Sequence, residues 1–395
     1  MLNLPQRSPR CPFFMLSLLC LIIPLSLTAQ IAQEKCKFLG NVIPATTPED
    51  FSTYWNQVTP ENGGKWGSVE SQRDEMNWSA LDNAYKFATD NQLPFKQHTL
   101  VWGQQQPSWM STLTATEQKE EVEEWIRAFC ERYPTTTYID VVNEPLHAVP
   151  DYASALGGSG STGWDWIVWT FEKARQYCPN AKLILNDYNI LNNDVATTNY
   201  LKIIELLKGK GLIDIVGEQG HFLETTPSAT IKKNLDRLAT VGLPIHISEY
   251  DVNLANDQQQ TEKYKEQFPI LWEHPAVKGI TLWGYRQGQI WREDAYLVRS
   301  NGSARPALTW LSKYVADSTP CDPVTGMLDD QDERMKVYPI PARDGRLTLD
   351  LGAGNFDITI RDLQGRIKKE VSVGGYEPVT LNLGAGHGLY LLEVY

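Results

Sequence analysis

The sequence predicts an α/β protein in which a (β/α)8 TIM barrel is followed by a small all-β sandwich-like domain. Between residues 37 and 317, short apolar runs alternate with longer amphipathic ones, which is the order that a parallel sheet with covering helices requires. Eight strands in about 280 residues fit a closed barrel better than an open sheet. After residue 334 the pattern changes to alternating apolar and polar residues, which indicates a separate β-domain.

The expected barrel strands are short apolar runs, several of them continuous and rich in β-branched residues, as strands buried on both faces are. They cover residues 38–43, 55–59, 94–100, 138–142, 182–186, 213–217, 244–248 and 279–283. The amphipathic runs predict helices at residues 78–91, 116–132, 164–177, 194–209, 228–241, 261–272 and 307–316. In the C-terminal domain, strands are expected at residues 347–351, 356–361, 367–373, 379–383 and 389–394.

The two ends of the chain differ from the barrel region. Residues 1–29 have the pattern of a secretory signal peptide, because Arg7 and Arg10 precede an apolar run at 13–27 that ends in small residues. Cys20 inside that run leaves a lipoprotein signal as an alternative. We expect the barrel to span residues 30–317. Residues 318–334 are rich in Pro, Gly and acidic residues and predict a linker, so the C-terminal domain spans residues 335–395.

The composition excludes several classes of function. The chain has 36 Lys and Arg against 48 Asp and Glu, and its net charge of −12 makes it a poor binder of nucleic acid. Outside the signal segment there is no run of about 18 apolar residues, so we expect no stable membrane insertion, and we expect a monomer. The six histidines are scattered and no Cys/His group has zinc spacing, so we expect no metal and no cofactor.

Four cysteines remain after the signal segment, namely Cys36, Cys130, Cys178 and Cys321. In an exported chain they allow two disulfides and three pairings. We favour Cys36–Cys321, because these residues bracket the barrel and the ends of a domain lie close together. We also favour Cys130–Cys178, because both residues end consecutive predicted helices. Free buried thiols are the alternative.

Polar residues follow one expected strand after another, and two of them are carboxylates at the ends of strands four and seven. Glu144 follows the apolar run IDVVN, and Glu249 follows IHIS. In a barrel the strand C-termini meet at one face, so both side chains can point into one cleft. Glycoside hydrolysis uses such a pair, one group as acid and the other as nucleophile or base. Salt bridges at the rim of the barrel are the structural alternative.

Five motifs occur in order along the chain: VTPENGGKW at 58–66, HTLVW at 98–102, DVVNE at 140–144, GEQGHF at 217–222 and SEYD at 248–251. Together they resemble the endo-β-1,4-xylanases of glycoside hydrolase family 10, over about 280 residues. The resemblance implies a (β/α)8 barrel that hydrolyses the xylan backbone with retention, by double displacement. It also implies that Glu144 is the acid/base and Glu249 the nucleophile, with xylan or xylo-oligosaccharides as substrate.

The resemblance further implies a substrate-binding set. Asn143 resembles the amide at the sugar 2-hydroxyl, and His221, accompanied by Gln219, resembles the imidazole bonded to the nucleophile. Lys65, His98 and Trp102 resemble the residues that hold the sugar at the cleaved position. Trp283 and Trp291 resemble the indoles that wall this position, with Arg292 beside them. The residues of the next subsite toward the non-reducing end correspond, by the same resemblance, to Glu61, Asn62 and Gln105. A structural reading is given to Trp66, His147, His246, His274 and Asp251, and a supporting role to Tyr188.

The chain departs from the family pattern at three places. Gly103 stands where the family has a His after the Trp, and Gln97 stands where it has a Gly before the His. Gly63 and Gly64 follow Asn62, where a bulkier residue is common. These departures concern the shape of the glycone subsites rather than the chemistry.

The C-terminal segments VYPIPA at 337–342, IRDLQGR at 360–366 and GLYLLEV at 388–394 resemble the sorting domain of type IX secretion, with Ile340 where Asn is usual. The resemblance implies the type IX machinery as a partner and an extracellular or cell-surface location. A carbohydrate-binding module is the alternative, but it requires an exposed aromatic strip, and this tail has no Trp.

Two other functions stay open at this point. One is a barrel β-glycosidase that acts on another β-glucan or on aryl glycosides. The other is a non-catalytic, sugar-binding barrel, which the presence of both carboxylates disfavours.

Overall fold

The computed structural model describes residues 30–320 and, nearer the C-terminus, 336–343, 346–350, 354–362, 366–375, 379–382 and 390–394. The predicted signal peptide at 1–29, most of the predicted linker and Cys321 lie outside the described residues. The sorting-domain motifs are described in part.

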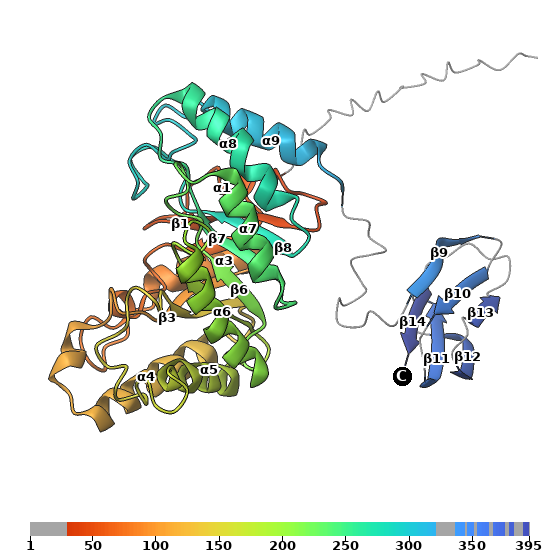
Figure 1. The fold of residues 1–395 in the computed structure, drawn as a ribbon, viewed down its shortest axis with the longest axis horizontal. Helices are drawn as coiled ribbons and strands as arrows, with labels where there is room; N and C mark the ends of the chain where they lie inside the picture. Colours follow the sequence, from red (N-terminus) through yellow and green to blue (C-terminus); the bar gives the residue numbers. More distant parts are fainter. Residues whose placement is uncertain are drawn as a thin grey trace, which may run out of the picture.

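Residues 38–282 contain an eight-stranded parallel sheet that is rolled into a barrel, as predicted (Figure 1). Its strands are β1 (Phe38–Ile43), β2 (Val58–Pro60), β3 (Lys96–Val101), β4 (Tyr138–Asn143), β5 (Lys182–Asp187), β6 (Ile215–Glu218), β7 (Ile245–Tyr250) and β8 (Val277–Leu282). They pair in the order β2-β1-β8-β7-β6-β5-β4-β3. A parallel bridge between Val58 and Phe95 joins β2 to the start of β3 and closes the ring.

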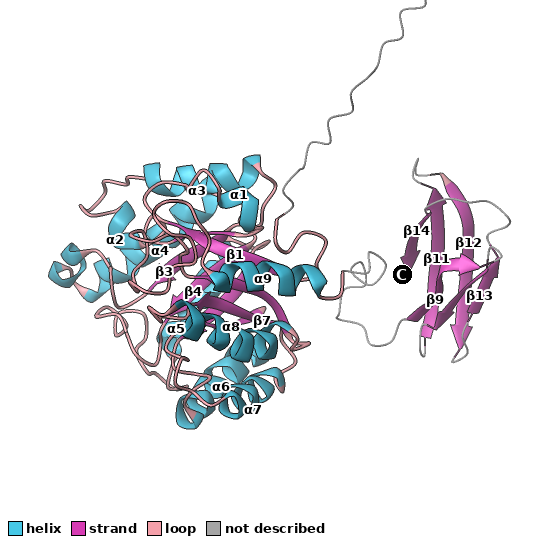
Figure 2. Ribbon diagram, turned by 90° about the horizontal axis from the view of Figure 1, so that it is seen from above, coloured by secondary structure: helices cyan, strands magenta, loops and turns pink. Residues whose placement is uncertain are grey.

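Helices surround these strands on the outside (Figure 2). The longer ones are α3 (Ser79–Asp90), α4 (Ala115–Arg132), α5 (Asp165–Tyr177), α6 (Asp194–Gly209), α7 (Ser228–Ala239), α8 (Asp257–Trp272) and α9 (Pro306–Asp317). Each matches a predicted helix within a few residues. α8 begins four residues before its predicted start, because Asn256 caps it by accepting a hydrogen bond from the Gln259 N–H at 3.0 Å.

Three short elements were not predicted: α1 (Phe51–Tyr54), α2 (Trp66–Val69) and a 3-10 turn at Ser108–Thr112. They have five residues or fewer, which is too short to show helical periodicity. α2 matters for packing, because the buried Trp66 ring stacks on Trp125 of α4, with centroids 6.1 Å apart and planes 7° apart. The prediction that Trp66 belongs to the core is confirmed.

The disulfide Cys130–Cys178 is confirmed. It joins the C-terminal ends of α4 and α5, with a Cα–Cα distance of 5.2 Å. Cys36 is also disulfide-bonded. Its expected partner, Cys321, lies outside the described residues, so the pairing Cys36–Cys321 stays a prediction.

The C-terminal part forms two three-stranded antiparallel sheets, β13-β10-β9 and β12-β11-β14. The strands are β9 (Lys336–Arg343), β10 (Arg346–Asp350), β11 (Gly354–Asp362), β12 (Ile367–Gly375), β13 (Val379–Asn382) and β14 (Tyr390–Val394). They share a small core of Leu349, Ile358, Ile360 and Leu381. β9 was not predicted as a strand, because Pro339 and Pro341 interrupt its pattern. It lies at a sheet edge, where proline is tolerated.

Among the helices in the described ranges, none combines the length and the apolar character needed to cross a bilayer.

Removing the disulfide should destabilise the barrel without changing its fold. The two cysteines are 48 residues apart, and closing a loop of that length stabilises the folded chain by about 3–4 kcal/mol. We therefore expect Cys130→Ser/Cys178→Ser to lower the melting temperature by several degrees, measured by calorimetry. Treating the wild-type protein with a reductant, which also breaks the disulfide of Cys36, should lower it at least as much. A double variant that melts with the wild type would contradict this expectation.

Candidate active site

A cavity of about 500 Å³ lies at the C-terminal ends of the barrel strands. The side chains that line it are Glu61, Asn62, Lys65, His98, Trp102, Gln104, Gln105, Asn143, Glu144, Tyr188, Gln219, His221, Phe222, Glu249, Trp283 and Trp291. The structure thus brings together every predicted site residue except Arg292. Gln104 and Phe222 were missed, and Tyr188 had been given a supporting role. Tyr188 directly follows Asp187, the last residue of β5, and Phe222 directly follows the predicted site residue His221; these positions are the signal that could have found them.

The barrel strands fix both carboxylates. Glu144 follows the last residue of β4 at φ +55°, and its backbone N–H donates to the Asn186 carbonyl at 2.7 Å. Glu249 is the fifth residue of β7, and its N–H donates to the Gln219 carbonyl at 2.7 Å. A positive φ is uncommon outside glycine, and here it turns the Glu144 side chain at the end of a rigid strand. Both carboxylates therefore sit on backbone held by neighbouring strands.

A chain of side-chain amides connects the two carboxylates. Asn186 Nδ2 donates to Glu249 Oε1 and to Asn143 Oδ1, each at 2.8 Å. Gln219 Nε2 donates to Glu144 Oε1 at 2.9 Å and lies 3.4 Å from Asn143 Oδ1. Because the Asn143 oxygen is the acceptor for both amides, its Nδ2 is left to donate into the cavity.

Asn186 is a functional residue that the sequence analysis missed. It is fully buried on β5, directly in register with Asn143 of β4. The Ser248 hydroxyl donates to Asn186 Oδ1 at 2.5 Å, which fixes the amide with its Nδ2 toward Glu249. The signal was present as a polar residue at the end of an expected strand, but its role depends on the pairing between strands.

Positive partners surround Glu249. His221 Nε2 lies 3.2 Å from Oε2, and His98 Nδ1 lies 3.9 Å from Oε1. Burial alone would raise the pKa of Glu249, but the charge interactions with His98, His221 and Lys96 outweigh burial and lower this pKa to about 2. Glu249 is therefore ionised over the whole ordinary pH range.

His221 is held in turn by a second carboxylate. Its Nδ1 lies 2.9 Å from Asp251 Oδ2, on the side opposite to Glu249. Burial lowers the pKa of His221, yet the charges of Asp251 and Glu249 overcome this effect and raise the pKa to about 10. Asp251 is thus a supporting carboxylate, in line with the structural role predicted for it.

The pKa of Glu144 is shifted in the opposite direction. Trp102 Nε1 donates to Glu144 Oε2 at 2.9 Å, and Gln219 donates to the other oxygen. Burial and the negative charge of Glu249 raise the pKa of Glu144 above its ordinary value, although these two hydrogen bonds partly oppose the shift. One cavity thus holds an ionised carboxylate and a carboxyl group that retains its proton to higher pH, which is the pattern of an acid and a nucleophile.

A polar cluster lies on the β2 and β3 side of the cavity. Lys65 Nζ donates to Asn62 Oδ1 at 3.0 Å and to Gln105 Oε1 at 2.6 Å. Gln105 Nε2 in turn donates to Asn62 Oδ1 at 3.2 Å. The Lys65 ammonium also lies 4.9 Å from the centre of the Trp102 ring. This arrangement supplies charged and amide groups above an aromatic ring, as a site for a pyranose requires.

Two of the departures from the family pattern, Gln97 and Gly64, are in direct contact. Gln97 Nε2 donates to the Gly64 carbonyl at 2.6 Å, so the Gln97 side chain occupies the space beside Gly64. A Cβ at residue 64 would lie 2.8 Å from Gln97 Oε1 and 2.6 Å from the His98 carbonyl. A side chain at residue 64 would therefore collide with the His98 backbone carbonyl as well as with Gln97, so glycine is required there.

The third departure brings two loops together. Gly103 donates its N–H to the Ala148 carbonyl at 3.0 Å, and a Cβ there would lie 2.3 Å from that oxygen. Gln106 Nε2 also donates to Asp151 Oδ2 at 3.0 Å. Glycine at 103 thus lets the loop after β4 pack directly on the loop after β3.

Arg292 is placed differently from its prediction. It is outside the cavity lining and pairs with Asp251 at 2.5 Å and Glu224 at 2.8 Å. Its guanidinium lies 4.7 Å from the centre of the Phe222 ring. The structure therefore shows Arg292 against the Phe222 ring and outside the cavity lining.

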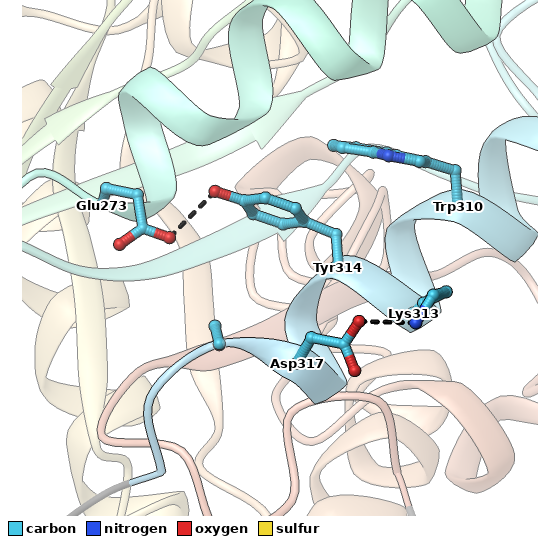
Figure 3. Close-up of a pocket in the computed structure, with 6 residues that line it drawn as sticks. Glu273, Trp310, Lys313, Tyr314 and Asp317 are labelled. Atoms are coloured by element: carbon cyan, nitrogen blue, oxygen red, sulfur yellow. Dashed lines mark hydrogen bonds and ion pairs between the residues drawn. The ribbon is translucent and has the colours of Figure 1, made fainter.

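A second hollow, of about 310 Å³, lies between the C-terminal ends of α8 and α9 (Figure 3). The Tyr314 hydroxyl donates to Glu273 at 2.9 Å, and Lys313 pairs with Asp317 at 2.6 Å. The Glu273 and Asp317 carboxylates are exposed, and each is already bonded to one of these neighbours. This end of the barrel is opposite to the strand C-termini, where barrel chemistry takes place. The 500 Å³ cavity is therefore the candidate active site.

One group of carboxylates among the described residues has metal-ligand spacing, formed by Glu70, Asp74 and Glu121, whose oxygens lie within 4.8 Å of one another. Glu70 already accepts hydrogen bonds from the Trp66 indole and the Asp74 N–H, and Glu121 accepts one from Arg73. None of these carboxylates lines the active-site cavity, so they contribute nothing to its chemistry.

Comparisons with known proteins point to one family. The model of glycosyl hydrolase family 10 matches residues 27–314. The chain is 47% identical over 278 residues to endo-1,4-beta-xylanase B of Cellvibrio japonicus, which covers 70% of this chain but only 45% of that protein. The chain thus spans less than half of that relative's length.

Two further relatives are matched over most of their own length. Endo-1,4-beta-xylanase A of Caldicellulosiruptor saccharolyticus is 29% identical over 270 residues, covering 61% of this chain and 78% of the relative. The crystal structure of xylanase 10B from Thermotoga maritima superimposes with a TM-score of 0.63 at 27% identity, covering 72% of this chain and 96% of that structure.

The opposite pKa shifts of the two carboxylates can be measured directly. We expect carbon-13 NMR titration of labelled carboxyl groups to give Glu249 a pKa far below the ordinary value and Glu144 a pKa above it. His221→Asn removes a positive charge from Glu249 and should raise its pKa. The matched variant His274→Asn, remote from the cavity, should leave it unchanged. An unaltered Glu249 titration in His221→Asn would contradict the account of the electrostatics.

Proposed function

Because the chain belongs to glycosyl hydrolase family 10, we propose that it is an endo-1,4-β-xylanase that cleaves the xylan backbone by double displacement with retention. Glu249 is the nucleophile and Glu144 the acid/base. The proposal extends to this chain an activity that the names of its relatives state for them.

The observation that carries the proposal is geometric: two buried carboxyl groups face one cavity, and each has its own set of partners. Glu249 is ionised and held by an imidazole and an amide, so it can attack an anomeric carbon. Glu144 keeps a proton to higher pH and can deliver it to the glycosidic oxygen. A sugar-binding protein without catalysis has no need for this separation.

The reaction proceeds in two displacements. Glu249 forms a bond to C1 of the sugar while the bond from C1 to the glycosidic oxygen breaks, and Glu144 transfers its proton to that oxygen. The leaving chain departs, and a glycosyl ester on Glu249 remains. Glu144, now a carboxylate, takes a proton from water as the water attacks C1 and releases Glu249. While the ester exists, Glu249 carries no negative charge that would repel a charge on Glu144. The pKa of Glu144 therefore falls before the second step, in which Glu144 acts as the base.

The residues around the carboxylates bind the sugar. Asn143 Nδ2 donates to the sugar 2-hydroxyl, because its oxygen is already used by Asn186 and Gln219. Lys65, Asn62 and Gln105 form the polar cluster for the glycone hydroxyls. The indoles of Trp283 and Trp291 provide faces for the apolar side of the pyranose.

We propose in addition that the protein is exported, with residues 1–29 as signal peptide and residues 335–395 as a sorting domain for type IX secretion. The disulfide Cys130–Cys178 supports an oxidising compartment. The small β-domain with its own core supports a separate folding unit. Mass spectrometry of the protein from culture medium should find a chain that begins near residue 30 and ends near residue 335. A chain retained inside cells with both ends intact would contradict this proposal.

The activity is tested with the purified full chain on xylan and on carboxymethyl cellulose. We expect reducing sugar from xylan and little from the cellulose derivative. Equal rates on the two polymers would favour the other β-glucanase reading. Absence of hydrolysis on both, with retained binding, would favour a sugar-binding barrel.

Replacing the nucleophile tests the residue assignment. Glu249→Ala should lower kcat on xylan by about 10⁴-fold or more, because no covalent intermediate can form. Azide should restore turnover of an activated aryl xylobioside and give the α-glycosyl azide, since it attacks from the face that Glu249 occupied. The control Glu273→Ala removes an exposed carboxylate of the second hollow and should leave kcat unchanged. Full activity of Glu249→Ala would overturn the assignment.

A further inference from the structure

The strand order of the barrel divides the cavity into two halves. Glu144 follows β4 and Glu249 lies on β7, and these strands separate β3, β2, β1 and β8 on one side from β5 and β6 on the other. The polar cluster of Asn62, Lys65 and Gln105 belongs to the first side. Under the proposed function the bond is cut between the two carboxylates, and the polar cluster holds the glycone. The half that contains β5 and β6 then receives the leaving part of the chain.

Phe222 follows β6 in this second half and has an unusual environment. Its side chain is 42% exposed although it is a large apolar residue, and it lines the cavity. Its φ is +60°, in the left-handed region that aromatic residues rarely adopt. Neither feature helps packing of the barrel core, because exposed apolar surface and left-handed backbone are both unfavourable in the free protein.

The surroundings hold the Phe222 ring in place. The Arg292 guanidinium lies 4.7 Å from its centre and is itself anchored by Asp251 and Glu224. The Trp291 ring is 6.0 Å away and nearly perpendicular, and the Tyr188 ring is 6.2 Å away at 65°. Phe222 thus links Trp291 to Tyr188, and the three rings form one wall along the cavity. Arg292, displaced from its predicted place at the sugar, supports this wall.

Tyr188 is positioned from its other side. The His147 ring packs against it with centroids 4.1 Å apart and planes tilted by 32°, and His147 is bonded to the buried Asp187 at 2.7 Å. The wall therefore runs from Trp291 through Phe222 to Tyr188, and ion-paired side chains hold it at Phe222, through Arg292, and at Tyr188, through His147. Such preorganised aromatic surface loses little conformational entropy when a sugar packs against it.

From these contacts we infer that Phe222 is a specificity-determining residue that binds the leaving-group part of a β-linked xylose chain. This inference rests on the proposed function. Phe222 supplies apolar surface to pyranose C–H groups beyond the cleaved bond, while the glycone is held by the polar half of the cavity. Only a substrate whose leaving group contains sugar units can contact Phe222. Phe222 therefore raises kcat/KM for chain substrates relative to short glycosides with small leaving groups.

The experiment compares two substrates that share a glycone. Xylohexaose places sugars in both halves of the cavity, whereas β-xylobiosyl fluoride leaves fluoride alone in the second half. Phe222→Ala in the full chain should lower kcat/KM for xylohexaose by about fivefold to tenfold. It should change kcat/KM for the fluoride by less than about twofold. Phe222→Leu, which keeps apolar bulk without a flat ring, should fall between Phe222→Ala and wild type.

Val195→Ala is the control, because Val195 is an exposed apolar residue that does not line the cavity, and it should leave both rates unchanged. If Phe222→Ala lowered kcat/KM equally for both substrates, the residue would only support the fold of the site. If kcat/KM were unchanged for both, Phe222 would not bind the leaving part of the chain. Either result overturns the inference while the proposed function stands. A wild-type protein inactive on both substrates would instead overturn the proposed function.

Discussion

Two carboxyl groups in one buried cavity repel each other when both are ionised, and the rest of the site is arranged around this constraint. The charge interactions with His98 and His221 lower the pKa of Glu249, whereas burial and the charge of Glu249 raise the pKa of Glu144. The amide chain through Asn143 holds them in fixed relation without adding charge. Removal of any member of this chain would leave a buried donor or acceptor unpaired, which is unfavourable in itself.

The barrel is what makes this arrangement possible. Asn143 and Asn186 are in register on neighbouring strands, and Gln219 directly follows the next strand. Three adjacent strand ends therefore place three side-chain amides side by side at the C-terminal end of the barrel. Loops after the strands vary around this fixed base. At Gly103 and Gly64, glycine allows a neighbouring loop or a larger side chain to come close, so the chain departs from its family in the loops while the carboxylate pair keeps its support.

Much of this was predictable from the sequence, and the misses have physical causes. Strands buried on both faces leave continuous apolar runs, so all eight barrel strands were found within a few residues, and the paired carboxylates follow from their strand ends. The role of Asn186 depends on strand register, which a single sequence does not encode locally. Arg292 was misplaced because its partners Asp251 and Glu224 are distant in sequence. β9 was missed because its prolines hide an edge strand.

Trapping the covalent intermediate tests the central claim most directly. A 2-deoxy-2-fluoro-β-xylobioside with an activated leaving group forms the glycosyl ester but slows its hydrolysis, because fluorine at C2 destabilises the charged transition state and forms no hydrogen bond of the kind Asn143 offers. Intact mass measurement should show one xylobiosyl adduct per chain, and peptide sequencing should place it on Glu249. An adduct on Glu144, or turnover without any adduct, would contradict the assignment of nucleophile and acid/base.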